Sequence, residues 1–202
     1  ISTLGLNYIS IDINISNQNK IPIWTTYFKR LSGNDPEIEP DISEISLPYY
    51  EFFENNDWVN IWTNDYTINN ILYWLIGTGN TPTPYTGPEI AFDGINYLYL
   101  DSSNHNNTNK VGYFTSRAFT PKDNYHISFA YNMYGPSMGS LKLQVLYNST
   151  WIDVFTTPKG NYQKSWMVKN ISLTNYVNKS IRVRFVGITD GYRSDMALDA
   201  IM

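Results

Sequence analysis

Apolar and polar residues alternate in short segments along most of this chain. Between residues 181 and 186, Ile181, Val183 and Phe185 share one parity while Arg182 and Arg184 share the other. Alternation with a period of two places the apolar side chains on one face of a β-strand and the arginines on the opposite face. Such segments recur from residue 49 onward with turn residues between them, a pattern typical of an antiparallel β-sandwich. No stretch keeps a helical apolar period for three turns, so we expect almost no helix.

The first 30 residues contain two further apolar segments. From Leu4 to Tyr8 apolar residues occupy even positions, and from Ile9 to Ile15 they occupy odd positions. A β-bulge near Tyr8 would bring both sets to one face. Residues 21–28 predict a second strand, which Pro22 restricts to a sheet edge. We therefore expect a β-hairpin over residues 1–30, which is either an appendage of the main domain or the end of a preceding one.

A segment rich in acids and prolines follows this predicted hairpin. Residues 31–48 lack an apolar period and contain three prolines and five acidic residues. This composition predicts a solvated linker. The chain then divides into a hairpin segment at residues 1–30, a linker at 31–48 and a sandwich domain at 49–202.

One carboxylate stands inside an apolar strand near the end of the chain. Asp199 shares a parity with Ala197 and Ile201, and Leu198 and Ala200 occupy the alternate positions. A buried charge needs a compensating partner. A metal ion, an arginine or backbone amides would each satisfy Asp199.

An ordered series of short motifs over residues 49–201 resembles the MAM domain family. The motifs are Phe53, Glu54 and Trp58, then Trp74 with the glycine- and proline-rich loop 77–88, the strand 96–103, the strand pair 127–135 and 139–145, Trp151, Trp166 and the ending 197–201. The resemblance implies a jelly-roll β-sandwich. It also implies a non-catalytic extracellular module for adhesion or recognition within a larger cell-surface or secreted protein.

The chain departs from animal members of this family in two ways. It has no cysteine, so packing alone must hold the fold, as in disulfide-free bacterial relatives. One aspartate, Asp199, stands where the family usually has two. The resemblance places the first and last strands side by side, so Glu54 and Asp199 could share a structural calcium ion, with Asp93 and Asp101 as further ligands. The alternative is that Glu54 pairs with an arginine: Arg182, Arg184 or Arg193.

Composition narrows the classes of partner. The formal charge is −4, and the basic residues are scattered, which argues against nucleic acid and against an anionic membrane surface. No apolar run is long enough to span a bilayer, so we expect no membrane insertion. Neither His105 nor His126 lies in a catalytic or metal-binding spacing, and we expect no enzymatic activity.

Aromatic residues make up 16% of the chain, which exceeds the needs of a core of this size. Exposed tyrosine and tryptophan side chains suit contact with sugars or proteins. Long loops on a rigid β scaffold commonly carry binding residues, and residues 77–94 are the longest loop candidate. The predicted ligand-binding residues are Tyr85, Tyr97, Tyr134, Trp151 and Tyr192.

The expected partners are a glycan or protein on a cell surface and the neighbouring domains of a larger polypeptide. Two other functions fit the same predicted fold. One is a carbohydrate-binding module accessory to a secreted hydrolase, and the other is a receptor-binding protein of a virion or phage. The sequences beside this segment would separate the first alternative from an adhesin, and trimerisation in solution would favour the second.

Overall fold

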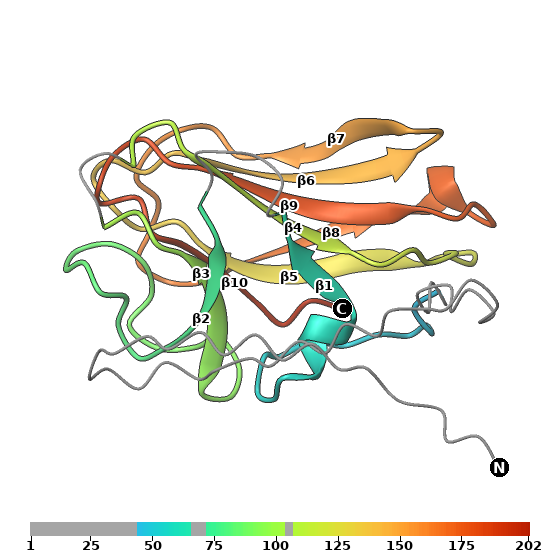
Figure 1. Cartoon of the computed structure of the whole chain (residues 1–202), viewed down its shortest axis with the longest axis horizontal. Helices are drawn as coiled ribbons and strands as arrows, with labels where there is room; N and C mark the ends of the chain where they lie inside the picture. Colours follow the sequence, from blue (N-terminus) through green and yellow to red (C-terminus); the bar gives the residue numbers. More distant parts are fainter. Residues whose placement is uncertain (1–43, 66–71, 104–106) are drawn as a thin grey trace, which may run out of the picture. The chain divides into compact units, whose positions relative to one another are not determined.

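The computed structural model describes residues 44–65, 72–103 and 107–202, which form a sandwich of two five-stranded antiparallel sheets (Figure 1). In spatial order, the first sheet contains β1 (Trp62–Asn64), β4 (Val111–Ser116), β9 (Arg182–Ile188), β6 (Ser140–Tyr147) and β7 (Thr150–Thr156). The second contains β2 (Trp74–Thr78), β3 (Asn96–Leu100), β10 (Met196–Asp199), β5 (His126–Asn132) and β8 (Met167–Ser172). The predicted hairpin at residues 1–30 lies outside the described residues.

The all-β prediction is confirmed. Apart from strands, the described residues contain only two short 3-10 helices, η1 (Asp57–Asn60) and η2 (Thr174–Tyr176). The parity expected for β9 is also confirmed, because Val183 and Phe185 are buried while Arg182 is exposed. Among the described residues, no helix is both long and apolar enough to cross a membrane.

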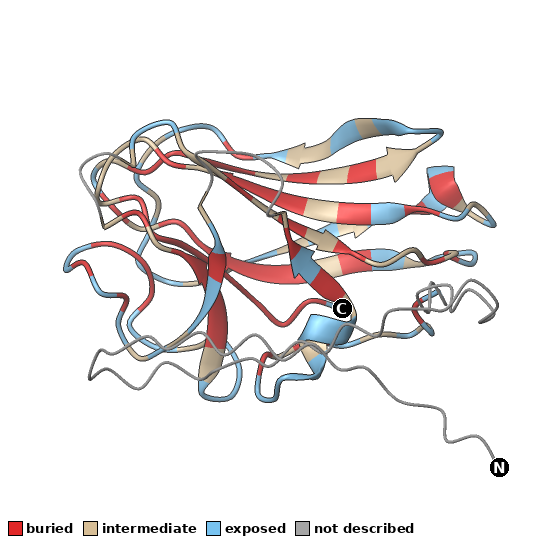
Figure 2. Cartoon of the chain, viewed as in Figure 1, coloured by how far each residue is buried: buried red, intermediate tan, exposed pale blue. Residues whose placement is uncertain are grey.

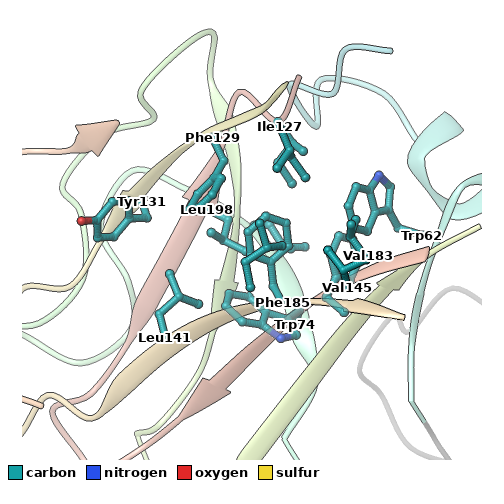
Figure 3. Close-up of a cluster of buried hydrophobic side chains, with 14 of the residues drawn as sticks. Trp62, Trp74, Ile127, Phe129, Tyr131, Leu141, Val145, Val183, Phe185 and Leu198 are labelled. Carbon is teal, nitrogen blue, oxygen red and sulfur yellow. The ribbon is translucent and has the colours of Figure 1, made fainter. Parts of the chain in front are cut away.

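Aromatic side chains fill the space between the sheets, and Figure 2 shows buried residues along the central strands. Trp62 and Phe114 stack with ring centroids 5.0 Å apart, and Phe185 contacts Phe129 edge to face at 4.9 Å. Trp62, Trp74 and Phe185 lie together in Figure 3. Edge-to-face and offset contacts add to the free energy gained by burying large rings. Packing of this kind holds the two sheets together without disulfides.

The beginning and the end of the sandwich are paired. The amide of Glu51 donates to the carbonyl of Ile201 at 2.8 Å, and the amide of Ile201 donates back at 2.9 Å. The family resemblance led us to expect that the opening and closing segments lie side by side. This pairing brings Glu54 and Asp199, which follow and precede it closely in sequence, to the same part of the fold.

The sandwich begins earlier than the boundary predicted at residue 49. Ile45 is buried in the core, and its amide donates to the carbonyl of Ala118 at 2.8 Å. Glu44 accepts hydrogen bonds from the hydroxyls of Thr120 and Ser180. Residues 44–48 therefore belong to the domain rather than to a linker. The sequence did not predict this, because the segment is rich in acids and prolines and only Ile45 and Leu47 pack on the core.

Candidate functional site

The connection between β2 and β3 is a long ordered loop whose first half, residues 80–89, encloses a groove. Buried threonines hold this half in place. The Thr81 hydroxyl donates to the carbonyl of Thr86 at 2.8 Å, and the Thr83 hydroxyl donates to that of Ser103 at 2.6 Å. Gly87 has φ +69°, and a Cβ there would lie 2.6 Å from the Thr81 side chain, so only glycine fits. The loop is thus fixed from beneath by its own short polar side chains.

The groove has a volume of about 400 Å³ and is completed by Tyr134 and Lys164 from outside the loop. We call it the loop groove. Lys164 forms an ion pair with Glu89 at 2.5 Å across exposed side chains. The groove therefore combines two tyrosine rings with an ion pair. Aromatic side chains beside a few placed polar groups are common in ligand sites.

Tyr85 is the most exposed aromatic residue of the loop groove. Its side chain is 66% exposed, and its backbone has φ +67°, a left-handed conformation that is strained for a bulky residue. The guanidinium of Arg193 lies 5.5 Å from the Tyr85 ring centroid and 5.1 Å from that of Tyr192. Strained, exposed residues concentrate at functional sites. Three predicted ligand residues, Tyr85, Tyr134 and Tyr192, are thus connected through the loop groove and Arg193.

A buried carboxyl group supports the loop from beneath. The Asp195 side chain is fully buried, and its Oδ1 accepts hydrogen bonds from the amide and hydroxyl of Ser102 at 2.7 and 2.9 Å. The Asp195 amide donates to the hydroxyl of Thr86 at 3.0 Å. Oδ2 has no hydrogen-bond partner among the described residues. Burial raises the pKa of Asp195, and the two hydrogen bonds from Ser102 oppose this rise.

The second half of the loop, residues 90–95, is held by two of the predicted metal ligands. Oδ2 of Asp199 accepts the amides of Phe92 and Asp93 at 2.9 and 3.1 Å, and Oδ1 accepts that of Ala200 at 2.7 Å. Of the three partners that the sequence allowed for Asp199, the structure shows backbone amides. Burial raises the pKa of Asp199 to about 6, whereas these amides favour the charged form.

Glu54 holds the same half of the loop at its other end. Its Oε1 accepts the amides of Ile95 and Asn96, both at 2.8 Å, and these bonds lower the pKa of this exposed carboxyl. Gly94 has φ +66°, and a Cβ there would lie 2.3 Å from that oxygen. The predicted alternative, an ion pair between Glu54 and an arginine, is wrong. Arg182 and Arg184 donate instead to the Ser116 carbonyl and to Gln144, and Arg193 lies against tyrosines.

The structure brings Glu54, Asp93 and Asp199 to one loop but places Asp101 elsewhere. Asp101 accepts hydrogen bonds from the amide and hydroxyl of Ser103. Across residues 44–65, 72–103 and 107–202, no three His, Asp or Glu side chains are grouped to hold a metal. The carboxylate oxygens of Glu54 and Asp199 have the chemistry that calcium prefers, and a calcium ion at this loop stays a prediction.

Two predicted ligand residues, Tyr97 and Trp151, neither line the loop groove nor contact Arg193. Tyr97 is fully buried, because Ala91 and Trp166 pack over it and its hydroxyl donates to the carbonyl of Gly79 at 2.7 Å. The expectation that Tyr97 is exposed for ligand contact is therefore wrong. Trp151 lies on β7, where its ring contacts the guanidinium of Arg184 at 4.0 Å.

Sequence reasoning missed several residues at these surfaces. Lys164 reaches the loop groove from a separate segment, and nothing in its sequence neighbourhood predicts this. The role of Arg184 could have been found, since the alternation in β9 placed it on the outward face. His126 lies exposed at the start of β5, and His105 lies outside the described residues.

Fold and surfaces together define a disulfide-free β-sandwich module that presents an ordered loop groove. The family model described as the MAM domain, meprin/A5/mu, matches residues 52–202, and the chain belongs to this family. The motif order that resembled this family is thereby confirmed.

Solved structures with a similar fold include bacterial adhesin domains. The K2 adhesin domain of Lys-gingipain matches with a TM-score of 0.55 and 15% identity, over 76% of this chain and 96% of that chain. The K1 adhesin domain of Lys-gingipain from Porphyromonas gingivalis W83 has a TM-score of 0.49 and 14% identity, over 76% and 95%. The family 22 carbohydrate-binding module of Clostridium thermocellum Xyn10B has a TM-score of 0.47 and 17% identity, over 76% and 90%. At these identities the likeness concerns the fold alone.

Proposed function

We propose that this chain is a non-catalytic recognition module of a cell-surface or secreted protein and that it contacts its partner through the loop groove. Membership of the MAM family supports a role in adhesion or recognition. The observation that carries the proposal is Tyr85, a 66% exposed ring in a strained backbone conformation beside a groove of about 400 Å³. An aromatic anchor on a rigid loop binds with little loss of conformational entropy.

The rigidity of the groove supports recognition rather than catalysis. The hydroxyls of Thr81, Thr83 and Thr86 are all engaged in hydrogen bonds within the domain. Asp195, the acid whose pKa is raised beneath the loop, is fully buried and does not line the groove. A general acid must reach the proton it transfers. The acid and the base that do line the groove, Glu89 and Lys164, are joined to each other in an ion pair. The groove therefore offers complementarity of shape and charge rather than an unpaired group for proton transfer.

The test uses the purified chain on a glycan array and on cultured cells, with Tyr85→Ala compared against Tyr50→Ala. Tyr50 is also exposed, at 57%, but lies outside the groove. We expect Tyr85→Ala to weaken binding about tenfold or more, as for interface hot spots, and Tyr50→Ala to leave it unchanged. Equal binding by both variants would contradict the proposed surface.

The same experiment separates the remaining partner classes. Binding to cells that survives enzymatic removal of glycans points to a protein partner, and binding to the array points to a carbohydrate-binding module. A trimer in sedimentation experiments would favour the receptor-binding protein of a virion. Turnover of any glycan or peptide by the purified chain would refute the non-catalytic role.

A further inference from the structure

A second surface, on the outer face of the first sheet, carries a connected group of aromatic and charged side chains. Its members are Tyr113 on β4, Arg184 on β9, Lys142 and Gln144 on β6, and Trp151 and Asp153 on β7, and we call them the sheet-face cluster. Figure 1 shows β9, β6 and β7 as neighbours. The adjacent positions Phe114, Phe185, Leu143 and Val145 are core residues, so the cluster points away from the core.

Arg184 is the centre of this cluster. Its guanidinium carbon lies 4.6 Å from the ring centroid of Tyr113 and 4.0 Å from that of Trp151. Its Nε donates to Oε1 of Gln144 at 2.6 Å and is the only guanidinium nitrogen that bonds another described residue. Two rings and one amide therefore fix the plane of the guanidinium while its terminal nitrogens keep free donor capacity.

Hydrogen bonds extend the cluster across three strands. Gln144 donates to Oδ1 of Asp153 at 2.5 Å, and Lys142 donates to Oδ2 at 2.7 Å. Neighbouring strands lie about 4.8 Å apart, so the row from β9 to β7 spans about 10 Å. The side chains of Lys142 and Asp153 remain 28% and 41% exposed. The surface thus offers a row of partly used donors and acceptors beside a tryptophan ring.

The charge of this face differs from that of the whole chain. The basic residues on its strands are Arg182, Arg184 and Lys142, and the acid is Asp153. A second acid, Asp65, follows β1 and acts on Arg184 electrostatically. Bases outnumber acids by three to two here, although the chain as a whole carries −4. Charge complementarity therefore favours an anionic ligand on this face.

We propose that the sheet-face cluster binds an acidic saccharide, with a sugar ring against Trp151 and a uronic carboxylate on the terminal nitrogens of Arg184. A guanidinium fork holds a carboxylate with two parallel hydrogen bonds. Vicinal hydroxyls are donors and acceptors at once, which suits the mixed row formed by Gln144, Asp153 and Lys142. Acidic peptides fit less well, because peptides on β-proteins usually join a sheet edge or enter a groove, whereas this is a sheet face.

The experiment titrates the chain by calorimetry with uronic-acid oligosaccharides, their carboxyl-reduced counterparts and a poly-glutamate peptide. Wild type should bind the acidic oligosaccharide at least tenfold more tightly than the reduced one, and added salt should reduce this preference. Trp151→Ala should weaken binding of both sugars about tenfold. Arg184→Lys keeps the charge but loses the fork, so it should lose the preference for the acidic form.

The controls separate this site from the loop groove. Tyr85→Ala should bind the acidic oligosaccharide as wild type does, so the two proposals can fail independently. Trp151→Phe retains a ring and should bind more tightly than Trp151→Ala, which guards against a variant that loses affinity through misfolding. Absence of acidic saccharide binding by wild type, unchanged affinity in Trp151→Ala and Arg184→Lys, or equal binding of poly-glutamate would each overturn the proposal.

Discussion

The outer faces of the two sheets differ in how far their outward side chains are exposed to solvent. On the first sheet, Tyr113, Arg184 and Trp151 remain partly exposed and form an open polar surface. On the second sheet, Tyr97 and Ala197 are buried under Ala91 and Trp166. We call residues 90–95, which include Ala91, the covering loop. The same alternation of residues thus produces a potential binding surface on one side and a second small core on the other. Residues outside the strands, rather than the strands themselves, determine the difference.

The covering loop is itself secured by polar groups. Asp199 accepts the amides of Phe92 and Asp93, Glu54 accepts two amides at the far end, and the indole of Trp166 donates to the carbonyl of Ile90 at 2.9 Å. These bonds fix a segment whose Ile90 and Ile95 side chains are largely exposed. Without them, apolar contact alone would have to keep the loop on the sheet.

Truncating one tyrosine on each face should give the largest difference in the free energy of unfolding. Tyr97→Ala removes a fully buried ring and should lower the free energy of unfolding by about 3 kcal/mol or more, as for other large core truncations. Tyr113→Ala on the open face should cost below about 1 kcal/mol. Urea denaturation of the two variants measures both values. Similar losses would mean that the covering loop does not bury Tyr97 in solution.

Calcium should stabilise the covered side of the sandwich. If Glu54 and Asp199 share a calcium ion, a hundredfold excess over its dissociation constant should add about 2.7 kcal/mol to the free energy of unfolding. The melting temperature would rise by several degrees in a domain of this size. Thermal melts with calcium and with a chelator test this.

The calcium melts need two variants beside the native chain. Asp199→Asn should lose the calcium response, and Glu89→Gln, which changes an exposed carboxylate elsewhere, should keep it. If the native chain melts at the same temperature with calcium and with chelator, the shared calcium ion is ruled out. The backbone amides bonded to Asp199 are then the only compensation for its charge.

A pH titration should sharpen the contrast between Asp195 and exposed acids. Burial raises the folded-state pKa of Asp195 above its unfolded value, so the folded chain holds the proton more tightly. The stabilising contribution is present below the unfolded pKa, about 3.9, and is lost as pH rises through the folded pKa. Asp195→Asn should therefore be at least as stable as wild type at pH 7.5 and should lose this advantage towards pH 3.5. Chemical denaturation from pH 3.5 to 7.5 measures the free energy of unfolding of both proteins. A difference between them that stays constant with pH would contradict the prediction.

Glu54→Gln should produce the smallest and most local effect. An amide oxygen is a weaker acceptor than a carboxylate, so the amide hydrogens of Ile95 and Asn96 should exchange faster. Those of Phe92 and Asp93, bonded to Asp199, should keep their protection. Hydrogen exchange resolved by residue provides the measurement, and uniform acceleration through the loop would show that the two carboxylates act together.

The alternation of residues was enough to predict the sandwich and the orientation of β9, because the period of two is a local property of a strand. It could not predict Tyr97, whose burial depends on Ala91 and Trp166 from other segments. The apolar surroundings of Asp199 predicted a partner without identifying it, because amides, arginine and metal all satisfy a carboxylate. Trp151, a predicted ligand-binding residue, lies on a strand, where pairing with Leu146 sets its position.

The pairing of Glu51 with Ile201 has a mechanical consequence. In an antiparallel bridge, residue 50 and residue 202 lie on the same side of the paired residues. Tension between these two points loads the two hydrogen bonds between Glu51 and Ile201 one after the other. In shear geometry both bonds would be loaded at the same time. The two bonds between Met202 and Ser128 lie nearer the pulled end and would be loaded before this pair. Under pulling force the pairing of the opening and closing segments should therefore break while the aromatic core is still packed.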